Sequence, residues 1–255
     1  MLLEARGQRI LIDTGAGVTL EKNATALGVD LSRLDAVFLS HGHYDHTGGL
    51  EALLKMNRHS SLPVYGHPDI FDEKYSLREG QEPRYIGMPR RRAELEALGA
   101  DFKLSRGPQS PCEGISTTGE IPRVAAEKPP GPSFLLKKGN RFTEDLLRDD
   151  QAMVIESSAG LIVLLGCAHA GLVETLGHIL SQTERGRICA VLGGTHLLHT
   201  PEKQLGSIIA RLERFSLEMI APCHCTGIGA TCALRRAFGE RCLEHRAGSV
   251  FEFPL

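Results

Sequence analysis

The sequence has neither a long hydrophobic run nor an excess of charge of one sign. Its longest nearly uninterrupted apolar stretch is Leu161 to Leu165, with Cys167 and Ala168 just beyond, and this is far too short to span a bilayer. Lysine and arginine total 29 against 31 aspartate and glutamate residues, which gives a net charge of -2. Because the chain carries no overall basic field, we expect neither nucleic acid nor a membrane as its partner.

The sequence also shows no pattern that predicts a disulfide framework or a secretory signal. The seven cysteines are odd in number and scattered from Cys112 to Cys242, which suits a reducing compartment better than a set of disulfides. The first residues, Met1 to Arg6, show no basic segment followed by an apolar one, so no secretory signal is expected. We therefore predict a cytoplasmic protein.

Short β-rich apolar runs alternate with helical patterns along most of the chain. This alternation predicts an α/β fold, and the 42% hydrophobic content is enough for a full core in one domain of residues 1–255. Strands are predicted at 9–12, 36–39, 63–65, 152–155, 161–165, 188–192, 218–220 and 250–253. Helices are predicted at about 49–57, 171–182, 202–214 and 228–238, the third opening with Pro201 behind a Thr200 cap.

Residues from about 67 to 150 follow a different pattern, with most of the chain's 13 prolines, many charges and only short apolar runs. A short helix is predicted near 92–98, and strands near 102–104, 115–117 and 134–136. Long stretches of this segment have no clear periodicity. Segments of this kind in compact domains are usually functional, so we predict an irregular, lid-like insertion.

The segment His41-Gly42-His43-Tyr44-Asp45-His46 places three imidazoles and a carboxylate directly after an apolar run. His41 and His43 alternate across a non-helical turn, so both rings can point at one ion. Asp45 and His46 lie slightly further along, a spacing that suits two adjacent metals. Imidazole and carboxylate ligands suit zinc, iron or manganese, and the donor set alone does not choose among them.

Further polar residues follow other predicted strands. Asp13 comes after 10–12, His169 after 161–165, His196 after 188–192 and His224 after 220–222. Because open α/β sheets place their ligands at the carboxyl ends of the strands, we expect one rim to gather these residues and the six-residue motif. His169 and His224 would supply further metal ligands there.

Several of these residues have more than one interpretation. His196 can contact metal, hold a substrate phosphate or form a hydrogen bond across the rim, and we favour substrate contact. Cys223-His224-Cys225 could bind zinc, but one such pair is a weak signal, and inert buried thiols are the favoured interpretation. The other histidines lack a strand-end context and are interpreted as surface or core residues; they are His59, His67, His178, His199 and His245.

The predicted insertion also carries a set of cations near glycines and prolines. If it folds over the rim, it brings these cations to an anionic substrate, and arginine in particular suits phosphate. The alternative is a solvated charged loop. The residues concerned are Lys74, Arg78, Arg84, Arg90, Arg91, Arg92, Arg123 and Lys128.

The order of Ile12-Asp13-Thr14-Gly15, the H-x-H-x-D-H motif at 41–46 and the later strand-end histidines resembles the metallo-β-lactamase superfamily. The resemblance implies an αββα sandwich with one or two divalent metal ions, zinc being favoured, at the sheet edge. It also implies ligand roles: His41 and His43 for the first metal, and Asp45, His46 and His224 for the second. By the same resemblance Asp13 braces the motif loop and acts on the metal through another residue.

Within the superfamily, five segments resemble the subgroup of 7,8-dihydropterin-6-methyl-4-(β-D-ribofuranosyl)aminobenzene-5'-phosphate synthase, whose members are also called metal-dependent hydrolases. The segments lie at 40–50, 118–123, 166–171, 193–197 and 224–227. Two positions depart from the broader superfamily. Thr118-Gly119-Glu120 stands where a third histidine is expected, and Gly166-Cys167-Ala168-His169 stands where a bridging aspartate is expected. Glu120 is either an oxygen ligand or a surface carboxylate, and His169 is a ligand, a residue behind the ligands or a core histidine.

The function expected from these residues is that of a metal-dependent hydrolase acting on a phosphorylated or otherwise anionic small metabolite, with Asp45 orienting the nucleophile or relaying its proton. The subgroup's name implies an alternative, a transferase that condenses a dihydropterin diphosphate with an aminobenzene ribofuranosyl phosphate. A second alternative is a non-catalytic metal-binding or ligand-binding sensor, which the missing bridging aspartate would explain. Only Met1 to Glu4 could serve as the subgroup's first strand, and an exposed strand beside it would invite a homo-oligomer.

Overall fold

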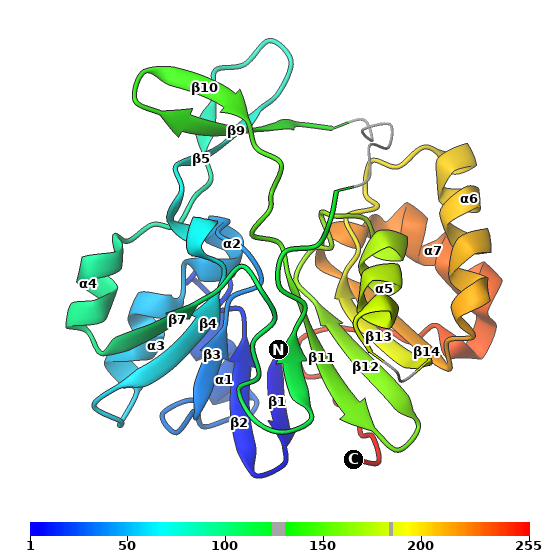
Figure 1. The fold of residues 1–255 in the computed structure, drawn as a ribbon, viewed down its shortest axis with the longest axis horizontal. Coiled ribbons are helices and arrows are strands. Elements are labelled where there is room, and N and C mark those ends of the chain that lie inside the picture. The colour runs from blue at the N-terminus through cyan, green and yellow to red at the C-terminus, as the bar shows by residue number, and fades with distance from the viewer. Residues whose placement is uncertain (124–130, 184–185) are drawn as a thin grey trace.

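The computed structural model describes residues 1–123, 131–183 and 186–255, and it contains two five-stranded sheets packed face to face (Figure 1). In spatial order, the first sheet consists of β1 (Leu2–Ala5), β2 (Gln8–Ile12), β3 (Ala36–Phe38), β4 (Leu62–Gly66) and β7 (Ala100–Leu104). The second consists of β14 (Met219–Cys223), β13 (Ile188–Gly194), β12 (Gly160–Leu165), β11 (Ala152–Ser157) and β8 (Ile115–Thr117).

Each central strand is apolar on both faces because both faces are covered. In β12, Leu161, Val163 and Leu165 pack against helices, whereas Ile162 and Leu164 join the cluster between the sheets. Side chains alternate between the two faces of a strand, so an unbroken apolar run such as this one marks a strand buried on both sides.

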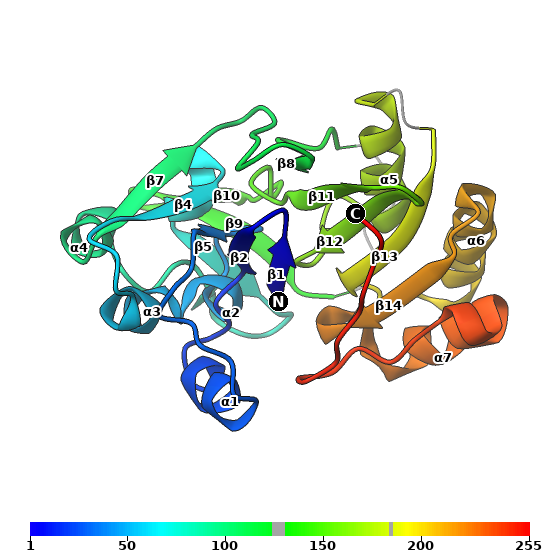
Figure 2. The same cartoon turned by 90° about the horizontal axis from the view of Figure 1, so that it is seen from below.

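Helices cover the two outer faces of the sandwich (Figures 1 and 2). On the first sheet lie α1 (Leu20–Ala26), α3 (Leu50–Met56) and α4 (Arg92–Ala97), and on the second lie α5 (Leu172–Ser181), α6 (Glu202–Leu212) and α7 (Gly227–Phe238). The short helix α2 (Tyr44–Thr47) follows β3. These layers confirm the predicted αββα sandwich. Among the described residues, no helix has the length and apolar character needed to cross a membrane.

The predicted insertion is only partly a separate structure. A small third sheet of β10 (Arg141–Glu144), β9 (Ser133–Lys138), β5 (Lys74–Leu77) and β6 (Arg84–Tyr85) projects beyond one end of the sandwich (Figure 1). The predicted elements near 92–98, 102–104, 115–117 and 134–136 are all present as α4, β7, β8 and β9. However, β7 pairs with β4 and β8 pairs with β11. The prediction of one irregular insertion over 67–150 was therefore wrong, since these two short strands complete the main sheets.

Two local predictions also differ from the structure. Residues 250–253 form no strand; Phe251 and Phe253 instead pack against the core between the sheets, which explains their alternating apolar pattern. The helix expected to open with Pro201 begins at Glu202, with Pro201 in an extended conformation before it. Leu2–Ala5 does form an edge strand, antiparallel to β2.

Lys74 connects the small sheet to the loop that carries the six-residue motif. Its side chain is 1% exposed, and its Nζ donates to Asp145 Oδ2 at 3.0 Å and to Asp149 Oδ1 at 2.9 Å. The second oxygen of Asp149 accepts the backbone N–H of Gly42 at 2.8 Å. The sequence left two interpretations for Lys74, a substrate cation or part of a solvated charged loop. Neither holds, because Lys74 and both of its carboxylate partners are buried inside the protein.

Lys74→Ala would leave these two carboxylates buried without their cation. We expect a loss of about 3–5 kcal/mol in the free energy of unfolding, measured by urea denaturation at neutral pH. Lys55→Ala is the matched control, because Lys55 forms an exposed pair with Glu51 at 2.7 Å, and a pair of that kind contributes about 1 kcal/mol or less. Equal, small losses in both variants would contradict the structural role given to Lys74.

Candidate metal centre

Parallel strands bring the carboxyl ends of both sheets to one rim. In the first sheet β2, β3 and β4 are mutually parallel, and in the second β12, β13 and β14 are. Four non-glycine residues at these strand ends have left-handed backbone conformations, with φ of 56° at Asp13, 54° at Ala168, 51° at His196 and 51° at His224. Such conformations are uncommon outside glycine and persist where the surrounding fold enforces them. All four lie at the strand ends that form the rim.

A first group of donors consists of His41, His43 and His169. His41 Nε2 lies 3.0 Å from His43 Nδ1, and a nitrogen of His169 lies within 4.8 Å of a donor atom of each. His41 and His43 come from the turn between β3 and α2, whereas His169 comes from the loop after β12. Segments more than 120 residues apart in the sequence thus meet here.

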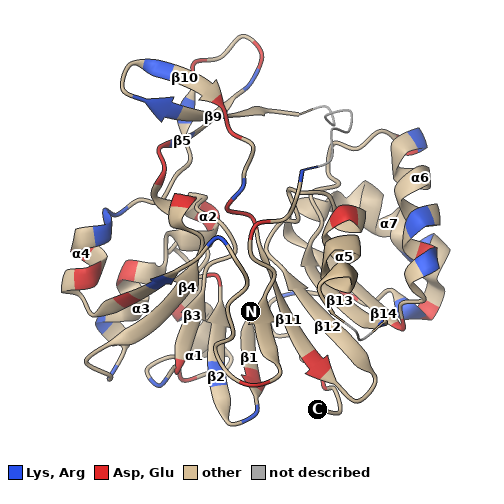
Figure 3. Cartoon of the chain, viewed as in Figure 1, with Lys and Arg blue, Asp and Glu red and all other residues tan. Residues whose placement is uncertain are grey.

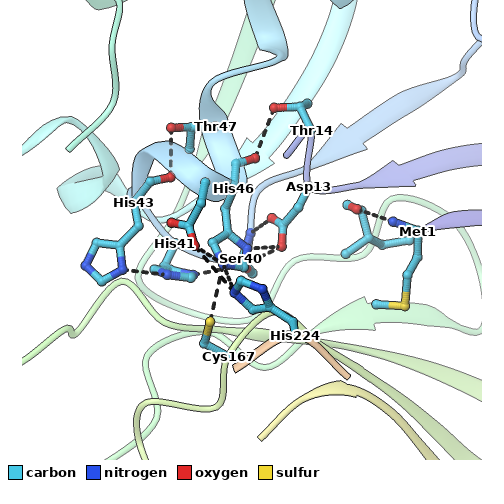
Figure 4. Close-up of polar contacts among 12 residues, drawn as sticks. Met1, Asp13, Thr14, Ser40, His41, His43, His46, Thr47, Cys167 and His224 are labelled. Atoms are coloured by element: carbon cyan, nitrogen blue, oxygen red, sulfur yellow. Dashed lines mark hydrogen bonds and ion pairs between the residues drawn. The ribbon is translucent and has the colours of Figure 1, made fainter. Parts of the chain in front are cut away.

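A second group consists of Asp45, His46 and His224. Nε2 of His46 lies 3.2 Å from Nε2 of His224 (Figure 4). Oδ2 of Asp45 lies 3.4 Å from His224 Nε2 and 3.7 Å from His46 Nε2. Asp45 and His46 belong to α2, which begins directly after His43. The ring centroids of His41 and His46 are 4.1 Å apart, so the two groups adjoin.

The first group has the properties of a metal site. Among the described residues, His43 Nε2 and His169 Nε2 are buried atoms without a hydrogen-bond partner. Burial lowers the pKa of His43 to about 3 and lowers the pKa of His41 and of His169 well below 6.5. Buried, neutral imidazoles with free lone pairs are the form in which histidine binds divalent metals.

Asp13 holds the motif loop through both carboxylate oxygens. Oδ1 accepts the backbone N–H of Ser40 at 2.8 Å, and Oδ2 accepts the Ser40 hydroxyl at 2.8 Å and Nδ1–H of His46 at 2.7 Å. Because the Ser40 hydroxyl donates to Asp13, it can accept Nδ1–H of His41, 3.0 Å away. Both histidines then direct Nε2 toward the rim. Asp13 occupies the bracing position that the resemblance implied.

The same carboxylate changes the charge of His46. Burial opposes protonation of this ring, but Asp13, assisted by Asp45, outweighs burial and raises the pKa of His46 to about 9. A metal ion at His46 must therefore displace a proton from Nε2.

Two glycines allow the close approaches on which the centre depends. A Cβ on Gly166 would lie 2.0 Å from the Ser40 hydroxyl, and one on Gly42 would lie 2.3 Å from the carbonyl oxygen of Ile70. Gly166 belongs to the second sheet's loop and Ser40 to the first sheet's loop. Only a residue without a side chain permits this contact between them.

Of the residues proposed as metal ligands, Glu120 lies apart from both groups. Its Oε2 is 3.2 Å from Arg106 Nη1 and 3.6 Å from Nε2 of His67. Within the described ranges no set of converging donor atoms includes it. The surface-carboxylate interpretation is therefore favoured over a ligand role. His67 is fully buried and directly follows β4, so the view that it lacks a strand-end context was wrong.

His196 reaches the edge of the first group. Its ring centroid is 4.2 Å from that of His169, and its Nδ1 is buried without a hydrogen-bond partner among the described residues. Substrate contact stays a prediction for this residue.

Sequence reasoning assigned no role at the centre to two side chains, those of Cys167 and Phe134. Cys167 Sγ lies 3.2 Å from His46 Nε2 (Figure 4), although its place in the Gly-Cys-Ala-His segment after β12 was a usable signal. The Phe134 ring from β9 lies 5.2 Å from His43 and 5.4 Å from His169, centroid to centroid. No pattern in the sequence indicated this second contact, because it depends on how the small sheet folds back.

Most of the cations considered as a substrate-binding cluster interact with other groups of the protein. Figure 3 shows where lysine and arginine residues lie along the ribbon. Arg90, Arg91 and Arg92 pair with Glu51, Glu94 and Glu96, respectively. Arg84 lies over the ring of Tyr44, and Arg123 donates to the carbonyl oxygen of Leu147. Lys128 lies outside the described residues. A concerted set of substrate cations is therefore not supported, although Arg123 remains beside the centre, close enough to His169 to influence its pKa.

Comparison with known proteins agrees with this geometry. The sequence profile of the metallo-beta-lactamase superfamily matches residues 1–135. The 7,8-dihydropterin-6-methyl-4-(beta-D-ribofuranosyl)-aminobenzene-5'-phosphate synthase of Methanocaldococcus jannaschii is 30% identical over 96% of this chain and 85% of its own length. An uncharacterised protein of the same organism is 30% identical over 90% of this chain and 83% of its own. The crystal structure of a metal-dependent hydrolase of the beta-lactamase superfamily has a TM-score of 0.82 at 29% identity, covering 96% of this chain and 89% of that one.

Asp13→Asn tests the electrostatic part of the brace. In metal-free protein, NMR titration of the histidines should show the pKa of His46 falling from about 9 in the variant, because the carboxylate that opposes burial is gone. The stabilisation that Asp13 gives folded, protonated His46 is present in full below about pH 6.5 and is lost as the pH rises through about 9.

Asp35→Asn is the matched control, because the Asp35 carboxylate also accepts a backbone N–H, that of Arg9. This variant should leave the pKa of His46 unchanged. In the same Asp13 variant, metal affinity should fall by about 10- to 100-fold. An unchanged His46 pKa in Asp13→Asn would refute the brace.

Proposed function

Because the chain belongs to the metallo-beta-lactamase superfamily, we propose that it is a metal-dependent hydrolase of a phosphorylated or otherwise anionic small metabolite. The observation that carries this proposal is the pair of adjoining donor groups at one rim. One is formed by His41, His43 and His169, and the other by Asp45, His46 and His224. Such pairs suit two divalent ions, for which zinc is favoured and iron or manganese are the alternatives.

A bound metal supplies Lewis acidity, which polarises a substrate oxygen and lowers the pKa of water. Asp45 supplies a base beside it. Burial favours the neutral acid, but the hydrogen bond with His224 and the neighbouring His46 hold the pKa of Asp45 well below its usual range. An ionised carboxylate in this place can orient the nucleophile and accept its proton.

His196 and Arg123 are the groups proposed to bind the anionic part of the substrate. The unpartnered Nδ1 of His196 can donate to a phosphate oxygen when protonated on that atom. Arg123 is partly buried and lies near Asp150, which offsets its charge. A phosphate bound here would compete with Asp150 for the guanidinium.

A transferase is the second candidate. The relative that matches 96% of this chain is named as a synthase of a dihydropterin-ribofuranosyl-aminobenzene phosphate. Phe134 adds support, because a ring beside His43 and His169 offers a stacking surface for a planar heterocycle. In this reaction a dihydropterin diphosphate would lose its diphosphate, and an aminobenzene ribofuranosyl phosphate would take its place.

A third candidate is a sensor whose metal centre does not turn over, and it rests on the missing bridging aspartate. We also propose that the protein acts in the cytoplasm, since all seven cysteines are free thiols and suit a reducing compartment.

Metal content gives the first test. Protein purified without added ions should contain about two equivalents of divalent metal, and turnover of a phosphodiester such as bis(p-nitrophenyl) phosphate should disappear with a chelator and return with zinc. His43→Ala should reduce metal content, whereas His59→Ala, at an exposed position, should not. Full turnover in chelated protein would contradict the metalloenzyme proposal.

The two reactions can be separated with substrates. Hydrolysis predicts turnover of single phosphorylated compounds, and turnover only when a dihydropterin diphosphate and an aminobenzene ribofuranosyl phosphate are both present would favour the transferase. For the transferase, Phe134→Ala should raise KM for the pterin by about 3- to 10-fold through lost stacking. Phe142→Ala is the control, because Phe142 packs on Tyr75 of the small sheet. An unchanged KM in Phe134→Ala would remove the structural support for a planar substrate.

A further inference from the structure

Cys167 is the buried nucleophilic side chain closest to the centre that the proposed mechanism does not use. It is 3% exposed and occupies the turn between β12 and His169, where the superfamily would place an aspartate. Its thiol is a much softer ligand than a carboxylate. Its neighbours determine whether it is an inert core cysteine or a ligand.

The thiol lies between the two donor groups. Cys167 Sγ is 3.2 Å from His46 Nε2 of the second group. It also lies within 4.8 Å of donor atoms of His41 and His169 from the first, and of His224 from the second. The sulfur is therefore within reach of donor atoms from both groups.

The backbone accounts for that placement. Ala168 has a left-handed φ of 54°, which turns the chain sharply between Cys167 and His169, so that both side chains reach the same cluster. Gly166 before it approaches the Ser40 hydroxyl so closely that a Cβ there would lie 2.0 Å from it, which brings the turn against the motif loop. The sulfur is thereby held at the junction of the sheets.

Cys225 is the other thiol close by, but its contacts differ. Its Sγ accepts the backbone N–H of His196 at 3.2 Å, and a Cβ on Gly194 would lie 2.9 Å from it. Among the described residues, the donor set that includes Cys225 also contains His224 and Cys167, so Cys225 approaches the second group and Cys167.

We propose that Cys167 supplies a thiolate ligand shared by the two metal sites, in the place of the superfamily's bridging aspartate. The proposal rests on the proposed function in one respect, because it assumes that both donor groups bind divalent metal. On binding, the S–H proton leaves to solvent or buffer and a sulfur–metal bond forms, with no change in oxidation state. The missing aspartate is then a substitution of one bridging ligand by another and no longer favours a non-catalytic sensor.

A shared thiolate has a chemical consequence for metal selection. Sulfur ligands favour zinc, cobalt and iron over magnesium, calcium and manganese. The centre should therefore retain zinc or cobalt when challenged with a large excess of magnesium or manganese.

Cobalt(II) is the probe for this ligand, because cobalt bound to thiolate shows a near-ultraviolet charge-transfer band that carboxylate and imidazole do not give. Metal-free protein titrated with cobalt should develop this band while binding about two equivalents. Cys167→Ser should lose the band and bind metal at least about 10-fold more weakly at one site. Cys167→Asp should recover binding of both ions without the band.

Two cysteine variants serve as controls. Cys225→Ser removes the neighbouring thiol, and Cys189→Ser removes a buried thiol that contacts the Leu161 carbonyl and the Ser157 hydroxyl; both should retain the band. Circular dichroism of each metal-free variant identifies any variant that fails to fold. If Cys167→Ser does not fold, the cobalt spectra of Cys167→Asp and of the wild type decide whether Cys167 gives the band.

The outcomes separate this inference from the proposed function. Two cobalt ions bound by the wild type without a charge-transfer band, or a band that persists in Cys167→Ser, would overturn the thiolate bridge and leave the metalloenzyme intact. A band lost only in Cys225→Ser would transfer the ligand role to Cys225 and also overturn the inference. Failure of the wild type to bind any cobalt would overturn the proposed function itself.

Discussion

The three hydrogen bonds that Asp13 makes to Ser40 and His46 are the constraint on which the rest of the centre depends. They join the end of β2 to the loop after β3, and they fix His46 with Nε2 toward the second sheet. Through the Ser40 hydroxyl, which lies 3.0 Å from His41 Nδ1, they also orient the His41 ring. The second sheet can approach this loop only because Gly166 has no side chain. One short network therefore decides whether the histidines of the motif meet those from β12 and β14.

The small projecting sheet depends on the same loop. Lys74 at its base neutralises Asp149, and Asp149 holds the backbone of Gly42, so the sheet and the motif are attached through buried charges. Phe134 of β9, the strand paired with β5, lies beside His43 and His169. A substrate entering the centre would contact the Phe134 ring as well as the metal-binding histidines. A site with both kinds of contact is more selective for its substrate than a rim without the ring. This arrangement is compatible with hydrolysis and with transfer between ring-containing substrates.

Local patterns in the sequence predicted most of the sandwich, because its central strands are apolar on both faces and its helices keep helical spacing. Strand-end position predicted the histidines, since parallel strands align their carboxyl ends. Long-range pairing was beyond such reasoning: local patterns predicted strands at β7 and β8, but they did not show that these strands are edge strands of the two main sheets, beside β4 and β11. Glu120 and Cys167 also show that sequence position alone did not decide which residue belongs to the centre. Each stood where a ligand is expected, but Glu120 is drawn to Arg106, whereas Cys167 lies among the histidines.

The central claim is that two metal sites adjoin at the junction of the two sheets. Anomalous X-ray diffraction at the metal absorption edge, on crystals of the zinc-loaded protein, tests it most directly. The account predicts two anomalous peaks, one among His41, His43 and His169 and one among Asp45, His46 and His224, with Cys167 beside both. A single peak, or peaks away from these side chains, would contradict it.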